Sequence, residues 1–123
     1  MPVLLVDAAN VVGSRPDGWW RDRPGAARGL VARLAAAPPA ALLRAAGAGT
    51  EDVQVVVVLE GAARPGVAEG TYAHVEVRHA SASGDDLLAA LAGPGTVLIT
   101  ADRGLRERAR TRGAEVVGPR VLL

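Results

Sequence analysis

Acidic residues recur at the ends of apolar runs in this 123-residue sequence. Asp7 follows the first run, Glu60 the second and Asp102 a later one, while Asp85 and Asp86 open a helical segment just before that later run. If these runs are parallel strands, their carboxyl ends meet at one edge of a sheet, where ligands usually bind. Clustered carboxylates repel one another and raise each other's pKa values, a cost that a cation removes. The pattern therefore predicts a carboxylate-bound metal site.

The predicted oxygen ligands favour Mg²⁺ or Mn²⁺, as one or two ions. The sequence has no Cys, which excludes thiolate zinc sites and cysteine nucleophiles, and its fourteen basic residues are all Arg, which excludes a phosphate-loop lysine. Hard divalent cations bind a few carboxylates together with waters and substrate phosphate oxygens. An ion held in this way polarises a phosphodiester and activates a bound water.

Each acid taken singly also has a structural explanation. Asp102 could cap the helix that follows it, and Asp86 could be the return partner of Ser83 in a capping box. Asp7 is harder to explain in this way, because no helix signal follows directly after the strand that it ends. The joint placement of the acids at one edge favours the functional interpretation.

Alternating strand and helix signals indicate how these acids are positioned. Apolar or alternating runs predict five strands, at residues 3–6, 53–59, 73–78, 96–100 and 114–117. Helical spacing and helix-start signals predict helices from residue 22 onward, over 40–46, after Ser83 and over 103–112. We interpret 73–78 as an exposed edge strand and 62–71, which contains Pro65, as an irregular loop. Such alternation is typical of a parallel sheet covered by helices on both faces.

Composition and charge narrow the class of protein further. Half of the residues are hydrophobic but only three are aromatic, so the core must consist of Val, Leu and Ala. The formal charge of +1 predicts no general attraction to nucleic acid, so phosphate binding would depend on local arginines or on metal. The first apolar run is too short for a signal peptide or a membrane span, and we expect a cytoplasmic protein.

Three motifs resemble the NYN branch of the PIN-like nucleases. They are Val-Asp-Ala-Ala-Asn-Val at residues 6–11, Ser-Gly-Asp-Asp-Leu-Leu at 83–88 and Thr-Ala-Asp-Arg at 100–103, with 113–117 extending the likeness over nearly the whole chain. The resemblance implies a single domain over residues 1–123. Its fold would be a three-layer α/β/α sandwich around a central, mainly parallel five-stranded sheet, PIN-like and Rossmann-like. It also implies metal-dependent ribonuclease activity.

The resemblance assigns roles to individual residues as well. By this match the catalytic, metal-binding acids are Asp7, Asp85, Asp86 and Asp102. Asn10 would orient Asp7 or a ligand water. Glu60 stands where many relatives carry Asp-Gly, which makes it a further candidate metal ligand. The chain departs from the family in being shorter than many relatives and in its loop 62–71.

Aromatic and basic residues near the same strand ends are candidate substrate contacts. We expect these contacts from Arg103, Trp19, Trp20, Arg15 and Arg64. A Trp could stack on an RNA base, or both could fold back onto the core. Arginine suits phosphate, and Arg21 and Arg23 lie in the same region. His79 could act as an acid or base, but an edge-strand surface histidine is the simpler interpretation.

These observations favour an endoribonuclease that uses Mg²⁺ or Mn²⁺ and acts on RNA, with no membrane partner; the sequence leaves a homodimer open. Two alternatives remain, a non-catalytic RNA- or protein-binding module of the same fold and a metal-dependent hydrolase of a small nucleotide. An open, arginine-lined groove would favour polynucleotide, and a closed pocket a nucleotide. No Gly-x-Gly-x-x-Gly motif follows a strand, and no serine lies in a Gly-x-Ser-x-Gly turn.

Overall fold

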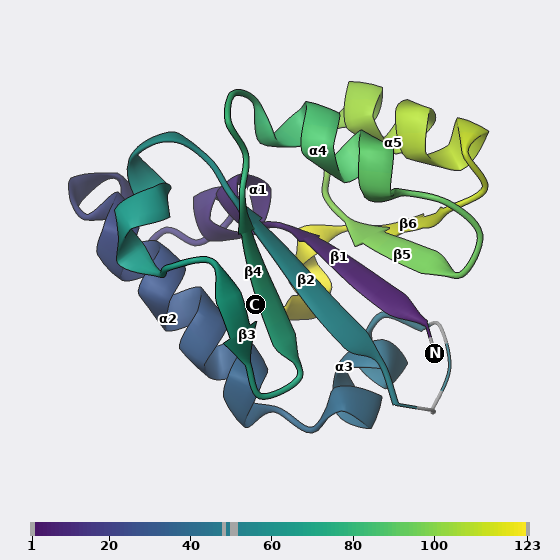
Figure 1. Cartoon of the computed structure of the whole chain (residues 1–123), viewed down its shortest axis with the longest axis horizontal. Coiled ribbons are helices and arrows are strands. Elements are labelled where there is room, and N and C mark those ends of the chain that lie inside the picture. The colour runs from purple at the N-terminus through teal and green to yellow at the C-terminus, as the bar shows by residue number, and fades with distance from the viewer. Residues whose placement is uncertain (1, 48, 50–51, 123) are drawn as a thin grey trace.

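A single mixed sheet runs through the computed structural model, which describes residues 2–47, 49 and 52–122. Within that part of the chain the strand order is β3-β4-β2-β1-β5-β6, and every neighbouring pair is parallel except β3 with β4 (Figure 1). The strands are β1 Val3–Asp7, β2 Gln54–Leu59, β3 Gly70–Tyr72, β4 Val75–His79, β5 Thr96–Ile99 and β6 Glu115–Val117. The carboxyl ends of β1, β2 and β5 therefore lie side by side.

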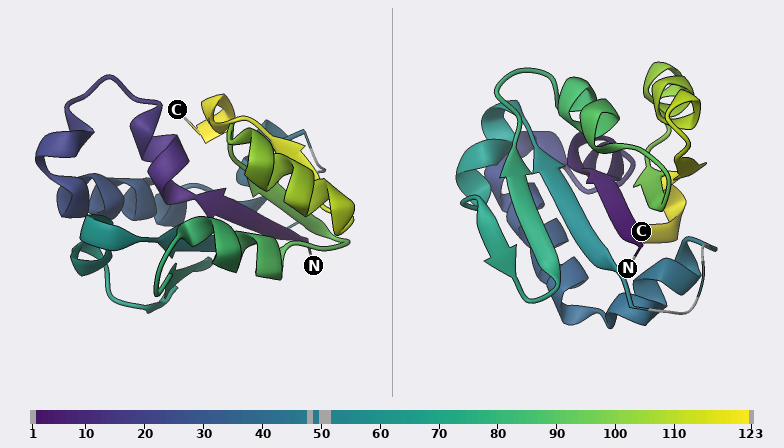
Figure 2. Two further views of the ribbon diagram at one scale, coloured as in Figure 1. Left: turned by 90° about the horizontal axis from the view of Figure 1, so that it is seen from above. Right: turned by 45° about the vertical axis from the view of Figure 1, so that its right-hand side comes forward.

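Helices cover both faces of this sheet (Figure 2). The α-helices are α1 Ala8–Gly13, α2 Arg23–Ala36, α3 Pro39–Ala45, α4 Gly84–Leu91 and α5 Arg103–Thr111, and the 3₁₀ segments are η1 Trp19–Arg21, η2 Gly61–Gly66 and η3 Pro119–Leu122. Side chains of β1 alternate between two cores: Leu4 packs with Leu30 of α2, and Leu5 packs with Leu88 of α4 and Leu105 of α5. The predicted three-layer α/β/α class is confirmed.

Most predicted elements form close to their predicted bounds, but the strand count differs. Within the predicted loop 62–71, the chain forms η2 and then enters β3, which pairs antiparallel with β4. The sheet thus gains a sixth strand, and β4 is not the edge strand that its alternating pattern predicted. Ala73, at a left-handed φ of 56°, lies in the turn between the two strands without the Asn-Gly or Asp-Gly signal of a tight hairpin.

Two further expectations about local structure are wrong. Helix α1 begins at Ala8, directly after Asp7, because the Asp7 carboxylate accepts a hydrogen bond from the Asn10 amide and caps the helix. His79 is half-buried, not an exposed edge residue, and its Nε2 lies 2.7 Å from the carbonyl oxygen of Val67. In the described part of the chain, no helix is long and apolar enough to span a bilayer.

Candidate active site

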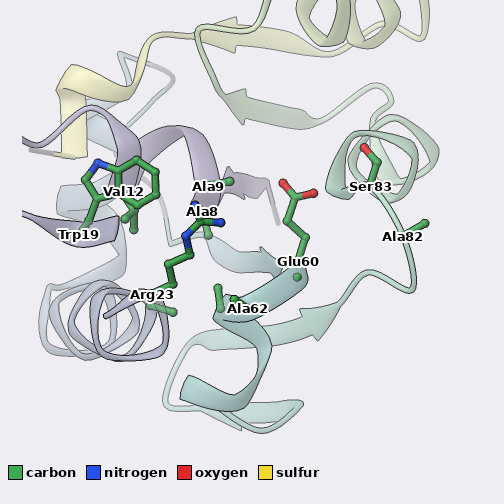
Figure 3. Close-up of a pocket in the computed structure, with 12 residues that line it drawn as sticks. Ala8, Ala9, Val12, Trp19, Arg23, Glu60, Ala62, Ala82 and Ser83 are labelled. Atoms are coloured by element: carbon green, nitrogen blue, oxygen red, sulfur yellow. The ribbon is translucent and has the colours of Figure 1, made fainter. Parts of the chain in front are cut away.

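A pocket of about 380 Å³ lies beside the carboxyl ends of β1 and β2. Ala8 and Val12 of α1 line it together with Trp19, Arg23 and Glu60. Figure 3 shows Trp19 and Arg23 on one side of the pocket and Glu60 on the other. The Arg23 guanidinium carbon lies 5.3 Å from the centroid of a Trp19 ring, a cation–π arrangement. The pocket therefore has apolar walls and opposite charges at its two ends.

Asp7, the last residue of β1, is the buried acid of the site. Only 5% of the residue is exposed, and Thr100 Oγ1 donates a hydrogen bond of 2.8 Å to Asp7 Oδ2. Burial raises the Asp7 pKa to about 6, and the charges of Asp85 and Glu60 add to the rise, against the hydrogen bonds from Thr100 and Asn10. An ionised Asp7 is therefore costly in the free protein, and a nearby cation would remove that cost.

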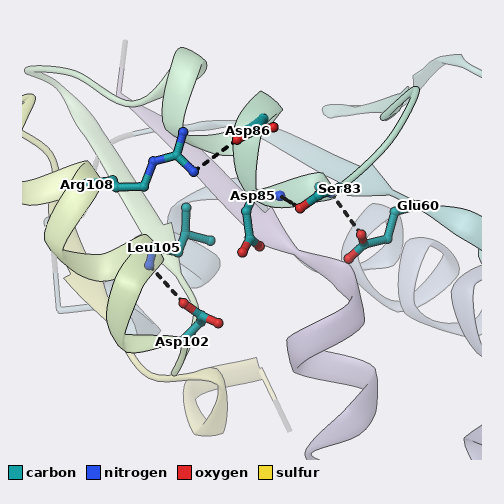
Figure 4. Close-up of polar contacts among 8 residues, drawn as sticks. Glu60, Ser83, Asp85, Asp86, Asp102, Leu105 and Arg108 are labelled. Carbon is teal, nitrogen blue, oxygen red and sulfur yellow. Dashed lines mark hydrogen bonds and ion pairs between the residues drawn. The ribbon is translucent and has the colours of Figure 1, made fainter.

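Asp85 lies in the first turn of α4, among the other acids. Its pKa is raised by partial burial and then by the charges of Asp102 and Glu60, while Arg108 opposes the rise. Figure 4 shows the Asp85 carboxylate between those of Asp102 and Glu60. The negative charges of these side chains therefore act on one another, as expected for acids that lie at one edge of the sheet. We refer to Asp7, Glu60, Asp85 and Asp102 together as the acid edge.

Two polar residues fasten β1 and α1 to the loop that carries Asp102. Thr100 Oγ1, besides donating to Asp7, accepts from the Asp102 amide at 3.1 Å, and Asn10 Oδ1 accepts from the Ala101 amide at 2.9 Å. The Asn10 side chain thus orients this loop, while its backbone amide bonds Asp7 at 3.4 Å. Asp102 Oδ1 accepts from the Leu105 amide at 2.8 Å, so Asp102 caps α5, as the structural explanation proposed.

Asp86 lies apart from the acid edge. Its Oδ1 accepts a hydrogen bond from Arg108 of α5 at 3.1 Å, in an exposed ion pair (Figure 4). Ser83 Oγ accepts from the Asp85 amide, and this bond caps α4. The Asp86 charge reaches Asp85 only as a minor contribution to the raised pKa of Asp85. A metal-binding role for Asp86 stays a prediction.

The acid edge suits a hard cation by its donor chemistry. Burial is the main cause of the raised pKa values of Asp7 and Asp85, and repulsion from the neighbouring carboxylates adds to it; a bound cation would offset both costs. Within residues 2–47, 49 and 52–122, however, no three acidic or histidine side chains are close enough to hold an ion among themselves. An ion in this arrangement would take at most two carboxylates directly, with waters or phosphate oxygens as its other ligands. This is a looser site than the shared point that the sequence predicts.

The predicted substrate-binding arginines have different surroundings. Arg15 pairs with Asp17 at 3.4 Å, and Arg64 donates to the backbone carbonyls of Gly61, in its own segment η2, and of Ala80. Arg103 is exposed at the first position of α5, directly after Asp102. A phosphate-binding role for Arg103 stays a prediction.

The two Trp residues also have different surroundings. Trp19 lines the pocket and is partly buried, whereas Trp20 is 55% exposed and meets Trp19 edge-on, with ring centroids 6.0 Å apart. The structure thus brings Trp19 to the candidate site and leaves Trp20 on the surface beside it.

Two site residues have no role assigned from the sequence. Thr100 lies within the Thr-Ala-Asp-Arg motif. Its position, a hydroxyl at the end of a buried strand, is the one sequence feature that could indicate a hydrogen bond to a neighbouring strand end. Arg23 is one of several arginines near the first strand in the sequence, and nothing in its local sequence indicates that it stacks on Trp19. Both roles depend on contacts made by the fold.

Comparisons with known proteins bear on the fold. No protein-family model and no curated protein sequence matches the chain. A search of solved structures found the crystal structure of Rae1 (YacP) from Bacillus subtilis, as its W164L mutant. The match covers 99% of this chain and 72% of that one, with 21% sequence identity and a TM-score of 0.62. The chain is therefore similar to Rae1 in fold, from its first strand to its last.

Proposed function

We propose that this protein is a metal-dependent ribonuclease that hydrolyses RNA phosphodiester bonds at the acid edge. The observation that carries the proposal is Asp7: a buried carboxylate at the end of a central strand, within the fields of Asp85 and Glu60. A carboxylate in this position is unfavourable for stability and is typical of a functional site. The resemblance of the three motifs to PIN-like nucleases supports the same activity.

Asp7, Asp85 and Asp102 are the proposed metal-binding acids, with no more than two of them as direct ligands of one ion and the third acting through a bound water. Bound Mg²⁺ or Mn²⁺ would supply Lewis-acid polarisation of the phosphodiester and an activated water. Thr100 fixes the Asp7 carboxylate, and Asn10 holds the loop before α5 in place. Arg103 would bind a phosphate oxygen through its guanidinium.

Hydrolysis of a small nucleotide is the second candidate function. The pocket favours it, because about 380 Å³ lies within the range of small-molecule sites and the pocket borders the acids. A non-catalytic RNA-binding module has less support, since grouped carboxylates would repel the RNA backbone. A cleavage assay with RNA and nucleoside triphosphates as substrates compares these alternatives.

The test is cleavage of labelled RNA, matched DNA and nucleoside triphosphates by the full chain, with Mg²⁺, with Mn²⁺ and with EDTA. We expect RNA cleavage that EDTA stops. Asp85→Asn should reduce it more than about 100-fold, since loss of residues that merely orient metal ligands typically costs 10- to 100-fold. Asp52→Asn is the matched control, because Asp52 is exposed just before β2, at the opposite end of that strand.

Two results would contradict the proposal. One is RNA cleavage that persists in EDTA, and the other is full activity in both Asp85→Asn and Asp7→Asn. Cleavage of nucleoside triphosphates without cleavage of RNA would favour the second candidate.

A further inference from the structure

The pocket beside the acid edge has polar groups that the proposed hydrolysis does not use. Arg23 lies over Trp19 on one side, and Glu60 lies on the other, next to Ser83 (Figure 3). Within the part of the chain that the structure describes, neither Arg23 nor Glu60 forms an ion pair. Donors and an acceptor are thus available to a ligand between apolar walls.

The Glu60 carboxylate is held in place and keeps free acceptor sites. Its Oε2 accepts from the Gly84 amide at 2.8 Å. Gly84 leaves just enough room for this contact, because a Cβ at that position would lie 3.3 Å from the Glu60 carboxyl carbon. A carboxylate has about four lone-pair sites, so Glu60 can accept two further hydrogen bonds.

The pocket wall opposite α4 is equally fixed. Segment η2 packs so closely on α2 that a Cβ at Gly66 would meet the Pro24 carbonyl oxygen at 2.2 Å, and Arg28 donates to the Gly66 carbonyl at 3.3 Å. The pocket is therefore formed before a ligand arrives, which reduces the entropy cost of binding.

A flat aromatic ligand that offers two adjacent N–H donors fits these groups. Single-stranded RNA bases stack on aromatic rings and on guanidinium planes, which Trp19 and Arg23 supply. Guanine presents N1–H and N2–H side by side, a pair that one carboxylate can accept. Adenine and cytosine present one amino group beside an acceptor nitrogen, and uracil presents one N–H between two carbonyl oxygens. A carboxylate repels the acceptor nitrogen and the carbonyl oxygens, so these bases fit it less well.

Ser83, another polar residue that lines the pocket, also suits guanine. Ser83 Oγ accepts from the Asp85 amide at 3.1 Å, which leaves its O–H free to donate to the guanine O6. Because Ser83 lines the pocket and Asp85 belongs to the acid edge, a base in the pocket places its own phosphate near the proposed metal site.

We propose that this pocket binds one unstacked guanine of the substrate RNA, with Glu60 accepting from its Watson–Crick edge and Trp19 and Arg23 stacking on its face. The inference deepens the proposed function and rests on it for the identity of the substrate. It gives Glu60 a role in base selection in place of metal binding.

The test is NMR titration of the full chain with GMP, AMP, CMP and UMP in EDTA. The four probes share one phosphate and differ in the base, and EDTA excludes binding through metal. Trp19 and Trp20 give two indole N–H signals, assigned with Trp20→Phe. We expect saturable shifts of the Trp19 signal, with GMP binding at least about tenfold more tightly than UMP, since sites that hydrogen-bond a ligand discriminate against analogues that leave their polar groups unpaired.

Two variants and one control variant locate the binding site. Glu60→Gln keeps the hydrogen bond to Gly84 but presents one donor and one acceptor, and we expect the GMP preference over AMP to disappear; Glu107→Gln, at an exposed position of α5, should retain it. Ala62→Leu should fill the pocket from its exposed rim and weaken GMP binding about tenfold or more without removing Trp19 or Glu60. Equal affinities for all four nucleotides, or an unchanged preference in Glu60→Gln, would overturn the inference.

These outcomes separate the inference from the proposed function. Asp85→Asn should abolish cleavage and still bind GMP with the same preference. Metal-dependent RNA cleavage by a protein that binds the four nucleotides equally would overturn the guanine pocket alone. A GMP preference in a protein that does not cleave RNA under any metal condition would support the pocket and overturn the ribonuclease.

Discussion

The inner and outer parts of the acid edge are built differently. Asp7 is buried at the end of a central strand and receives hydrogen bonds from Thr100 and Asn10, whereas Asp85 and Asp102 lie in the first turn or at the cap of surface helices. The inner carboxylate is fixed before any cation binds. The outer ones lie nearer to solvent, and Asp102 is held by the Leu105 amide. Under the proposed function, Asp7 would determine where an ion binds and the outer acids would complete its coordination.

The largest effect on stability is expected when Asp7 is neutralised. The Asp7 pKa is about 6 in the folded protein and 3.8 in the reference state, so Asp7 takes up protons on folding between these values. The contribution of Asp7 to stability therefore falls as pH rises from about 4 to 6 and is constant at higher pH. The shift corresponds to about 3 kcal/mol.

Asp7→Asn should remove this fall. Urea denaturation in EDTA at pH 4, 5, 6 and 7 should show the variant gaining about 3 kcal/mol relative to wild type over that range. Asp85→Asn, at a more exposed position, should show a smaller change in the same direction. Parallel pH curves for wild type and Asp7→Asn would show that the Asp7 charge is not costly in the folded protein.

Divalent metal should produce the next largest effect. At 100 times the dissociation constant, Mn²⁺ should stabilise the fold by about 2.7 kcal/mol at pH 7.5, measured as a rise in Tm. The rise should be smaller at pH 5, because protons compete for Asp7, whose pKa is about 6. It should disappear in Asp7→Asn and shrink in Asp85→Asn. Equal rises at both pH values would indicate that the ion does not bind at Asp7.

Replacing Thr100 by Val tests whether Thr100 stabilises the fold through Asp7. The change removes the hydrogen bond to Asp7 and the acceptor for the Asp102 amide, at an expected cost of about 1–3 kcal/mol at pH 7. The cost should be lower in an Asp7→Asn background, because the two side chains interact directly. A double-mutant cycle measures this coupling, and additive effects would mean that Thr100 does not act through Asp7.

The smallest effect is expected at Asp86. Its ion pair with Arg108 is exposed on both sides, so Arg108→Gln should change the free energy of unfolding by less than about 1 kcal/mol. Asp86→Asn should likewise leave RNA cleavage within a few-fold of wild type if Asp86 stays outside the coordination. A loss of cleavage as large as that in Asp85→Asn would show that Asp86 moves into the site when metal binds.

The strands and the acid positions could be predicted because they depend on local pattern. Runs of β-branched and aliphatic residues mark β1, β2 and β5, and parallel pairing brings their carboxyl ends to one edge. Asp7, at the end of β1, is therefore found from sequence alone. The third acid-bearing region, at the start of α4, follows from its capping signal.

The remaining features depend on contacts between distant residues. The bond from Thr100 to Asp7 joins residues 93 positions apart, and Asn10 meets Ala101 across 91 positions. Strand β3 forms because β4 offers it an edge, although its own composition favours a loop. The pocket likewise arises from the packing of η2 on α2. Such contacts leave no periodic signal in the sequence.

The tight seat of η2 on α2 has a consequence for engineering. One wall of the pocket is set by the contact of Gly66 with Pro24, whereas Asp7, Asp85 and Asp102 depend on β1, α4 and the loop before α5. Changes in the length or bulk of η2 would alter the shape of the cavity and leave those three carboxylates in place. Under the two proposals made above, base selectivity and turnover would thus depend on separate segments of one small chain.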